Sequence, residues 1–412
     1  MPKHICIVTS GHIGSAPRVV KEADALVADG YRVTVVAIDL LESVRARDRS
    51  VLARASWQAR LAGRGRPWRW HRRTLWEHVC RWGWRLGLRS TWLAEAASGR
   101  MVGELTRLAA GTHADLFIGH NLPGLCAAGR AATQTGGLLA FDAEDDHPGE
   151  VEDVPGDPAE VQRRVRIMRR WLPRCAFLTA AAPRMAANLR QRFGLPFVPL
   201  LNVFPLSDAQ AMPAPRCADQ PLIYWFSQTI GAGRGLEPLL AILARCRTPF
   251  RLDLRGTPSS GYEAVLRGYA AELAWPAERL QLLPPADPDQ MSRLSAGYAL
   301  GASLELSISE NRRSCLTNKI FQYLLAGLPV LLSTTPAQRE LADALGEAAV
   351  LIDLDDPAAS AARLDAWYQN HESRIAAVNK AHALAQTRYN WDTEQGILLR
   401  QVILALGSTR SA

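Results

Sequence analysis

Short apolar runs and amphipathic segments alternate from the start of the chain. The first 40 residues contain HICIVTS, GHIGSAP, RVVKEADALVADG and YRVTVVAID, a pattern that predicts strand, loop, helix and strand. The helical segment has apolar residues at helical spacing, namely Val20, Ala23, Leu26 and Val27. Gly30 then supplies the expected helix stop. This order is typical of a beta-alpha-beta unit, in which a helix connects two parallel strands.

The pattern continues in two series. Further strand candidates of the first series are ADLFIG, LLAFDAE, CAFLTAA and FVPLLN. A second series opens with PLIYWFS, the loop GAGRG and the helix LEPLLAILARC, and continues with RLDLRG, LQLLP, ASLELS, VLLST and AVLID. We therefore expect an α/β fold of two Rossmann-like, doubly wound domains that face each other across a cleft.

The domain bounds follow from the same pattern. The first domain is expected at 1–205 and the second at 220–388, with a Pro-containing linker at 206–219. In the remaining segment, 389–412, the helix candidate TEQGILLRQVILALG is expected to return to the first domain.

Composition supports a globular, intracellular protein. The chain of 412 residues is too long for one core, and 48% hydrophobic against 21% charged residues is the balance of a folded protein. Its 7 cysteines are scattered without a Cys-x-x-Cys pair, which argues against a disulfide framework or a zinc site. No apolar run approaches the roughly 18 to 20 residues of a membrane span, and MPKHICIVTSGHIG does not read as a signal peptide. We expect a cytoplasmic location.

The stretch TNKIFQYLLAGLPVLLST predicts a helix with a polar beginning. Thr317 or Asn318 can cap the helix, and AGLP ends it before a strand. In an open parallel sheet such a helix start lies at the ligand-binding edge, where its free N–H groups favour an anion such as a diphosphate. Lys319 adds a full positive charge there, and Gln322, one turn further on, can reach ribose hydroxyls.

A second helix start has similar chemistry. The run GAGRG lets the backbone approach a phosphate, and Arg234 offers two parallel donors. Each signal alone is also typical of an ordinary turn or a solvated cap. Two such starts in one half, each after a strand, favour nucleotide diphosphate binding.

Three segments, PRVVKEADALVADGYRVTVV, GAGRGLEPLL and NKIFQYLLAGLPVLLST, together resemble retaining GT-B glycosyltransferases of family 4, especially the subgroup with an Asn-Lys-x-Phe-Glu-Tyr signature. The resemblance runs in order from Pro17 to Trp391. It implies a UDP-, GDP- or ADP-linked sugar bound mainly by the second domain, an acceptor bound mainly by the first, and transfer with retention of configuration. No cofactor and no metal are implied.

The resemblance also implies the donor site. Arg234 matches the basic residue on the diphosphate, and Gln322 takes the position of the second Glu of the family's Glu-x7-Glu motif, which contacts the ribose. Ser314 stands at the first Glu, and Glu310 is an alternative contact to the sugar. The expected donor-binding residues are Gly14, Arg234, Gly235, Glu310, Ser314, Thr317, Asn318, Lys319 and Gln322.

In the first domain GHNLPGL resembles the segment whose His lies near the transferred sugar, which selects His120. FDAEDDHPGE resembles an Asp-x-His-Glu stretch at the same cleft and adds Asp142 and Glu144 as catalytic residues. On the acceptor side we expect Asp145 and, in the loop GHIGSAPR, Arg18.

Two departures keep other functions open. Gln322 retains hydrogen-bonding reach but lacks the charge of Glu, and Glu144 stands where the family has His. A pseudo-glycosyltransferase, or a relative that only binds nucleotide, is the alternative. The neighbouring acids Asp142, Glu144, Asp145 and Asp146 suit magnesium, but a solvated acidic loop is the favoured interpretation and no metal is predicted.

A basic insert at about 45–95 is rich in tryptophan. Between 45 and 92 there are 13 Arg against two acids, or +11, in a chain whose total net charge is +8. Seven of the 12 Trp lie within 57–92. Arg81, Arg85 and Arg89 recur every four residues, and another side of the predicted helix carries Leu75, Val79, Trp82 and Leu86.

Such a segment suits the interface of an anionic membrane, where indole rings lie at headgroup depth. The protein would then lie on the inner face of the cytoplasmic membrane and its acceptor would be lipid-linked, rather than a free glycan or a small molecule. An ordinary helical pair packed by its tryptophans, with Arg outward, is the alternative. A membrane or nucleic-acid adaptor is a third interpretation, in which nucleic acid is disfavoured because the basicity is confined to one insert. The Ala- and Arg-rich composition suggests a bacterial source, which suits synthesis of cell-envelope polymers or secondary metabolites.

Overall fold

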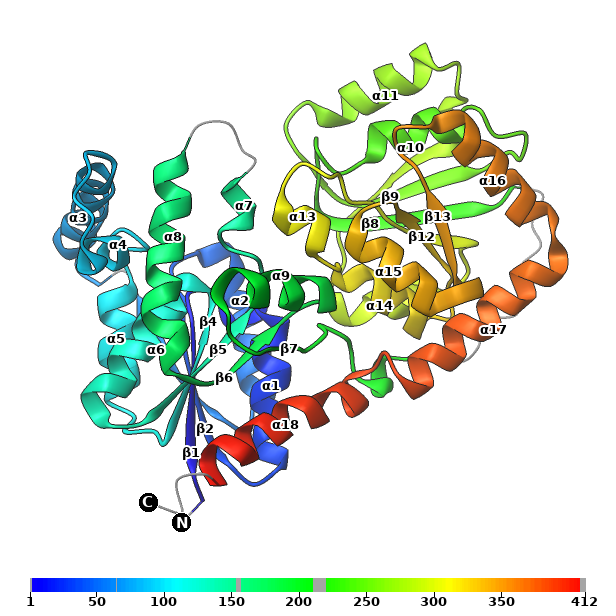
Figure 1. Ribbon diagram of the computed structural model, residues 1–412. Coiled ribbons are helices and arrows are strands. Elements are labelled where there is room, and N and C mark those ends of the chain that lie inside the picture. Colours follow the sequence, from blue (N-terminus) through cyan, green and yellow to red (C-terminus); the bar gives the residue numbers. More distant parts are fainter. Residues whose placement is uncertain (1, 64, 153–156, 210–219, 408–412) are drawn as a thin grey trace. The chain divides into compact units, whose positions relative to one another are not determined.

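A computed structural model describes residues 2–63, 65–152, 157–209 and 220–407 (Figure 1). The chain forms two compact units. Unit 1 comprises Met1–Leu200, Ser309–Asn311 and Gln395–Ala412, and unit 2 comprises Leu201–Ile308 and Arg312–Glu394. Most of the predicted linker, 210–219, and the last five residues of the expected C-terminal segment, 408–412, lie outside the described residues.

Unit 1 is built on a seven-stranded sheet of order β3-β2-β1-β4-β5-β6-β7, in which every neighbouring pair is parallel. The strands are β1 (His4–Thr9), β2 (Arg32–Asp39), β3 (Gln58–Gly63), β4 (Leu116–His120), β5 (Leu138–Ala143), β6 (Cys175–Ala180) and β7 (Phe197–Pro199). The register places Thr9, His120, Asp142 and Thr179 in one row across four strands. All four lie at or next to the carboxyl ends of their strands, so the register brings polar groups together at that edge.

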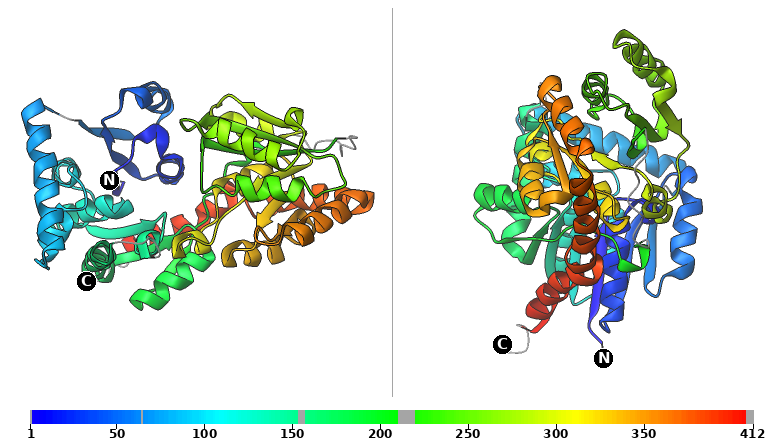
Figure 2. Two further views of the ribbon diagram at one scale, coloured as in Figure 1. Left: turned by 90° about the horizontal axis from the view of Figure 1, so that it is seen from above. Right: turned by 90° about the vertical axis from the view of Figure 1, so that its right-hand side faces the viewer.

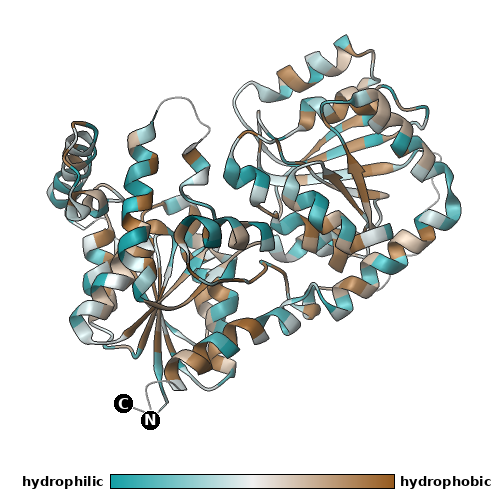
Figure 3. Cartoon of the chain, in the orientation of Figure 1, coloured by the Kyte–Doolittle hydropathy of each residue, from teal (hydrophilic) through white to brown (hydrophobic). Residues whose placement is uncertain are grey.

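Helices cover both faces of this sheet (Figures 1 and 2). They are α1 (Pro17–Ala28), α2 (Arg45–Arg54), α3 (Pro67–Arg85), α4 (Thr91–Ala96), α5 (Val102–Ala110), α6 (Asn121–Thr135), α7 (Gly149–Glu152), α8 (Pro158–Trp171) and α9 (Pro183–Phe193), together with most of α18 (Trp391–Gly407). The strands are predominantly apolar (Figure 3) because helices bury them on both faces. Close packing uses glycine: an added Cβ at Gly129 of α6 would lie 2.4 Å from the ring of Trp171.

Unit 2 is built on a six-stranded parallel sheet of order β10-β9-β8-β11-β12-β13. Its strands are β8 (Leu222–Ile230), β9 (Arg251–Pro258), β10 (Leu280–Leu283), β11 (Leu300–Ser303), β12 (Val330–Ser333) and β13 (Ala349–Ile352). The helices are α10 (Leu236–Leu243), α11 (Tyr262–Glu272), α12 (Met291–Ser295), α14 (Asn318–Leu325), α15 (Pro336–Leu345), α16 (Pro357–Gln369) and α17 (His371–Thr387), while α13 (Glu310–Ser314) begins in unit 1. A core of buried aliphatic and aromatic side chains joins this sheet to α10, α11 and α16.

The predicted α/β class with two parallel sheets is confirmed, and every strand proposed from an apolar run is present. β3 was not predicted. Of the two candidates for the cap of α14, Thr317 occupies the N-cap position. Its side chain makes no capping hydrogen bond, and Oγ1 lies 2.7 Å from Oγ of Ser303 instead. No helix within the described ranges is both long and apolar enough to cross a membrane.

A glycine lets α14 approach its sheet closely. A Cβ at Gly301 in β11 would lie 2.3 Å from the ring of Tyr323, and the Tyr323 hydroxyl donates to the carbonyl of Tyr224 or Ala302 at 3.3 and 3.2 Å. This contact fixes the helix that carries Lys319.

We expect Gly301→Ala to lower the free energy of unfolding by about 1–3 kcal/mol, because the added methyl must displace the Tyr323 ring. Chemical denaturation measures the change. Gly268→Ala in α11 is the matched control, since an added Cβ there meets nothing within 4 Å, and it is expected to be neutral or stabilising. An unchanged midpoint for Gly301→Ala would contradict this packing of α14 on β11.

Candidate functional site

Two helices of unit 2 begin after neighbouring strands of its sheet. α10 follows β8 through the GAGRG loop, and α14 follows β11. Gly233 and Gly235 have φ of 73° and 74°, a left-handed conformation that glycine adopts without the strain a side chain would add. A Cβ at Gly235 would also lie 3.0 Å from Cβ of Leu304. The glycine loop is therefore required by the turn as well as suited to close approach of a ligand.

Lys319 lies in the first turn of α14, close to Arg234. Its Nζ is 5.7 Å from the ring centroid of Trp225. Burial lowers the pKa of Lys319, the carboxylate of Glu305 opposes the lowering, and the positive charge of Arg234 adds to it. The two expected diphosphate residues thus act on each other electrostatically within one unit.

Glu305, the acidic side chain that acts on Lys319, already has an ion-pair partner. Glu305 is buried and its Oε2 accepts a hydrogen bond from the guanidinium of Arg312. Among the charged side chains that act on Lys319, the guanidinium groups of Arg234 and Arg312 thus stand against the one carboxylate of Glu305. The surplus of positive charge beside two helix N-termini is the arrangement that a bound diphosphate would neutralise.

The other expected donor residues of unit 2 lie near these helix starts. Gln322 is buried in α14, and its Nε2 donates to the carbonyl oxygen of Pro288 at 3.0 Å. Asn318 is the first residue of α14 and Ser314 is a fully buried residue of α13. The contact of Gln322 with a ribose stays a prediction, because its amide already holds the backbone of another loop.

In unit 1 the catalytic candidates form a buried polar network at the carboxyl edge of the sheet. Arg18 donates from Nη2 to Oδ1 of Asp142 at 2.7 Å and from Nη1 to the carbonyl of Leu200 at 2.8 Å. Oδ1 of Asp142 also accepts a hydrogen bond from the hydroxyl of Thr179. Arg18, predicted to lie on the acceptor side, is only 1% exposed, so here it orients Asp142.

His120 is held between carboxylates. Its Nε2 lies 3.1 Å from Oε2 of Glu22 and its Nδ1 lies 3.0 Å from Oε1 of Glu144. The ring is fully buried, whereas the side chain of Glu144 is 27% exposed. Any contact between His120 and a sugar therefore requires Glu144 to release Nδ1, and Glu144 is the member of this pair that solvent reaches.

The charge states follow from these contacts. Burial by itself lowers the pKa of His120, but the charge of Glu22 and the hydrogen bonds to Glu144 and Glu22 raise it to about 10. Burial raises the pKa of Asp142, but Arg18 and His120 outweigh burial and hold it below its ordinary value. At neutral pH the network therefore contains an imidazolium and a guanidinium among three carboxyl groups.

Within the described residues, Glu22, His120 and Asp142 place ligand atoms within 4.8 Å of one another. They do not fit a metal. A metal ligand must be a neutral imidazole, whereas His120 has both ring nitrogens bonded and its pKa raised, and Arg18 already supplies a cation to Asp142.

The segment that contains Gly14 is held to α2 by hydrogen bonds to Asp48. Gly14 donates its backbone N–H to Oδ1 of Asp48 at 2.7 Å, and Nδ1 of His12 lies 2.9 Å from Oδ2 of the same carboxylate. Nε2 of His12 accepts from the backbone N–H of Leu40 and Leu41. His12, Asp39 and Asp48 also place ligand atoms within 4.8 Å of one another, but these bonds occupy both nitrogens of His12, so they too do not suit a metal.

Sequence analysis missed three members of these sites. Glu22 follows Arg18 by one helical turn, a spacing that places both side chains on one face of α1. Thr179 lies near the end of β6, next to Asp142 in register. His12 lies in the glycine-containing loop. Asp145, the remaining acceptor-side candidate, follows Glu144, and burial raises the pKa of Asp145.

No family model matches this sequence, and no curated protein matches it either. Solved structures do resemble the fold over nearly the whole chain. HepE from Anabaena, in a complex with UDP and glucose, has a TM-score of 0.71 at 15% identity and covers 97% of this chain and 99% of its own. Sucrose-phosphate synthase from Thermosynechococcus elongatus has a TM-score of 0.72 at 13% identity, covering 98% of this chain and 100% of its own.

A third similar structure is a UDP-forming trehalose-phosphate synthase from Burkholderia xenovorans, with a TM-score of 0.66 at 13% identity over 97% of this chain and 98% of its own. A putative UDP-N-acetylglucosamine 2-epimerase from Listeria monocytogenes also matches, with a TM-score of 0.59 at 14% identity, covering 99% of this chain and 98% of its own. At these identities the likeness concerns the fold, which is the GT-B fold that was expected.

The raised pKa of His120 makes its contribution to stability depend on pH. A folded pKa of about 10, above the unfolded value of about 6.5, gives a contribution that is fully present below pH ~6.5 and is lost as the pH rises through ~10. His120→Gln is expected to cost about 3–5 kcal/mol at neutral pH, because it leaves buried carboxylates without their cation. The difference between the two proteins should shrink on the alkaline side.

Thermal unfolding at a series of pH values measures this difference. His78→Gln, at an exposed position of α3, is the control and should unfold like the wild type throughout. A difference between wild type and His120→Gln that stays constant from neutral to alkaline pH would contradict a protonated His120.

Proposed function

We propose that the protein is a glycosyltransferase that moves a sugar from a nucleotide diphosphate sugar to an acceptor with retention of anomeric configuration, as in the family 4 enzymes that the sequence resembles. The observation that carries the proposal is the surplus of positive charge from Arg234 and Lys319 at the starts of α10 and α14. The fold supports it, since similar structures were solved with UDP and with UDP-glucose. UDP, GDP and ADP are the candidate leaving groups.

In this proposal unit 2 stabilises the leaving diphosphate. Charge develops on the phosphate oxygens as the glycosidic bond breaks, and preorganised donors there are worth several kcal/mol. Arg234, Lys319 and the N–H groups of the first turns supply such donors, with no need of a cofactor. Burial is the main cause of the lowered pKa of Lys319, so the ammonium group lacks water, and a bound diphosphate would supply hydrogen-bond acceptors in its place. Gly235, Thr317 and Asn318 shape the two helix starts.

The remaining donor candidates would meet the nucleoside and the sugar. Gln322, one turn into α14, is proposed to contact the ribose, and Ser314 and Glu310 of α13 the sugar. Gly14, in the glycine-containing segment after β1, is proposed to contact the donor through its backbone.

The acidic network of unit 1 is proposed to contact the cation-like sugar and the acceptor. Glu144 is the catalytic candidate because its side chain is the partly exposed one, while His120 and Asp142 position it. The hydrogen bond to Nδ1 of His120 holds the Glu144 carboxylate in one orientation. Asp145 is proposed to contact the acceptor, and Arg18 to act through Asp142.

Two departures from the family pattern support a second candidate function. Gln322 replaces the acid of the family motif, and its Nε2 donates to the carbonyl oxygen of Pro288. Glu144 stands where the family has His. A pseudo-glycosyltransferase that joins a non-sugar unit, or a relative that only binds nucleotide, would also keep the cationic helix starts. Turnover separates the two, since only the transferase releases nucleotide diphosphate from a sugar donor.

Binding of the leaving group is tested by thermal shift with UDP, GDP and ADP. One of them is expected to stabilise the protein by about 3 kcal/mol at a hundredfold excess over its Kd. The double variant Arg234→Ala, Lys319→Ala should lose the shift. Arg267→Ala, which breaks an exposed ion pair with Glu263 in α11, is the matched control and should keep it. No shift with any of the three, or an undiminished shift in the double variant, would overturn the site.

Chemistry is tested with a panel of nucleotide sugars and acceptors. The product anomer, read from NMR coupling constants, is expected to match that of the donor. Glu144→Gln should lower kcat on the order of 10²-fold while the thermal shift with nucleotide is kept, because Glu144 lies in unit 1 and the diphosphate cations in unit 2. Glu104→Gln, in a partly exposed ion-pair group with Arg73 and Arg107 of unit 1, is the control for loss of a carboxylate. An inverted product, or full activity in Glu144→Gln, would count against the mechanism.

A further inference from the structure

The outer face of α3 is apolar and open to solvent. Of the 14 large hydrophobic side chains that are exposed in the described residues, eight lie between 68 and 92. Six of them are on α3 or directly after it and are 48–67% exposed: Trp68, Leu75, Trp76, Val79, Trp82 and Leu86. Five of these, with Arg72, recur at steps of four and three residues, so they form one continuous stripe along the helix.

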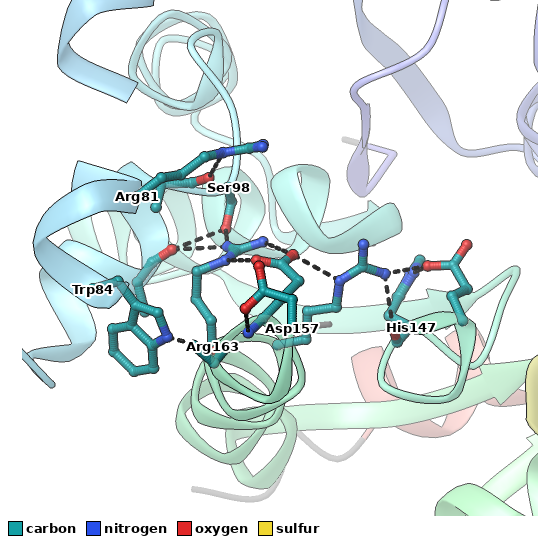
Figure 4. Close-up of polar contacts among 12 residues, drawn as sticks. Arg81, Trp84, Ser98, His147, Asp157 and Arg163 are labelled. Atoms are coloured by element: carbon teal, nitrogen blue, oxygen red, sulfur yellow. Dashed lines mark hydrogen bonds and ion pairs between the residues drawn. The ribbon is translucent and has the colours of Figure 1, made fainter. Parts of the chain in front are cut away.

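The inner side of the same helix is already occupied. Cys80 and Trp84 are buried, and Nε1 of Trp84 donates to the carbonyl of Ala159 in α8 at 2.6 Å (Figure 4). Arg163 of α8 in turn donates to Oγ of Ser98 at 2.7 Å.

The alternative interpretation, a helix packed by its tryptophans with Arg outward, therefore describes Trp84 but not the exposed Trp68 and Trp82. α3 is fixed to unit 1 by one side. On the other side Trp76 contacts Trp92, with ring centroids 5.7 Å apart, and both rings stay about half exposed. Figure 2 shows α3 at the periphery of unit 1.

The stripe is accompanied by uncompensated positive charge. Residues 66–92 contain seven Arg and one acid, Glu77. The Arg residues toward the inner side are paired, as in the bonds of Arg73 to Glu104 and of Arg81 to Glu77. Arg66, Arg69 and Arg72 have no ion pair with any described residue, and the guanidinium carbons of Arg69 and Arg72 lie 5.3 and 5.5 Å from the ring centroid of Trp68.

A hollow lies in this surface. It has a volume of about 770 Å³, and the residues that line it are Trp68, Arg69, Arg72, Arg73, Leu75, Trp76 and Val79. Apolar walls beside free guanidinium groups suit a molecule with an acyl chain and an acidic headgroup.

We propose that the outer face of α3, from Trp68 to Leu86, docks on an anionic lipid bilayer at headgroup depth. Indole rings favour that depth, aliphatic side chains reach the acyl boundary, and arginines attract the anionic headgroups. A second copy of the chain is a poor occupant, because it would bring another set of seven Arg against the first. A nucleic acid matches the charge but leaves the aliphatic part of the stripe without an apolar partner.

Docking by this face also points to the acceptor. Figure 1 shows α3 toward the end of unit 1 opposite to the start of β1, the end at which the strands finish and the Glu144 network lies. A bilayer bound there would deliver an acceptor that is itself carried by a lipid. This last step rests on the proposed glycosyl transfer, whereas the docking does not.

Sedimentation of the full chain with vesicles, without nucleotide, tests the docking. We expect binding to phosphatidylcholine vesicles that contain phosphatidylglycerol, little binding to pure phosphatidylcholine, and weaker binding at high salt. The variant Leu75→Glu, Leu86→Glu alters two side chains that are 65% and 64% exposed, so folding should be kept. It is expected to weaken vesicle binding by roughly tenfold or more, because two charges enter the apolar stripe.

Val265→Glu, on the 56% exposed Val265 of α11 in unit 2, is the matched control and should bind vesicles like the wild type. Absence of binding to the anionic vesicles, equal binding to neutral vesicles, or equal loss in the control would overturn the proposal. A wild-type dimer that Leu75→Glu, Leu86→Glu converts to monomer would assign the face to a second copy instead. Nucleotide-induced thermal shifts are expected to be unchanged in the variant, which separates failure of the docking from failure of the donor site.

Discussion

Parallel strand polarity is the constraint on which the candidate sites depend. A parallel connection must carry the chain back across the sheet, so each helix begins near the edge at which its preceding strand ends. In unit 2 this brings the start of α10 and the start of α14, and with them Arg234 and Lys319, to one edge of the sheet. In unit 1 the same polarity aligns His120 with Asp142 in neighbouring strands. Residues far apart in sequence become neighbours without any local signal between them.

The buried cations of the two units differ in how they are paired with carboxylates. In unit 1 the buried cations Arg18 and His120 each have carboxylates at hydrogen-bonding distance, so both cations are paired before a ligand arrives. In unit 2 the carboxylate of Glu305 is taken by Arg312, and the pKa of Lys319 is lowered. Cations held by buried hydrogen bonds fix the orientation of the groups around them, whereas a local excess of positive charge favours a ligand of the opposite sign. This contrast supports a positioning role in unit 1 and anion binding in unit 2.

Local chemistry decided what could be predicted from the sequence. Apolar runs of strand length located the strands of both sheets except β3, whose sequence QARLAG has no such run. The glycine loop marked the turn before α10 because only a left-handed conformation fits there, at Gly233 and Gly235. The ring of His120 could not be expected to be closed off, because its partner Glu22 lies 98 residues away on α1. Thr317 takes the predicted cap position of α14, but the contact of its hydroxyl with Ser303 of β11 could not be read from the local sequence.

The composition of α3 predicted a Trp- and Arg-rich helix but not which of these side chains are buried. The same two residue types serve opposite sides of one helix: Trp84 is buried with its indole N–H bonded to α8, and Trp82, two residues earlier, is 67% exposed. Paired arginines hold the inner side, and unpaired ones accompany the stripe. If the tryptophans were needed only to attach the helix, the outer ones would add exposed apolar area with no gain in packing, and smaller polar residues would serve solubility better. Exposed apolar side chains that line up on an otherwise anchored helix therefore favour a contact outside the chain, and the sign of the free charge makes that contact anionic.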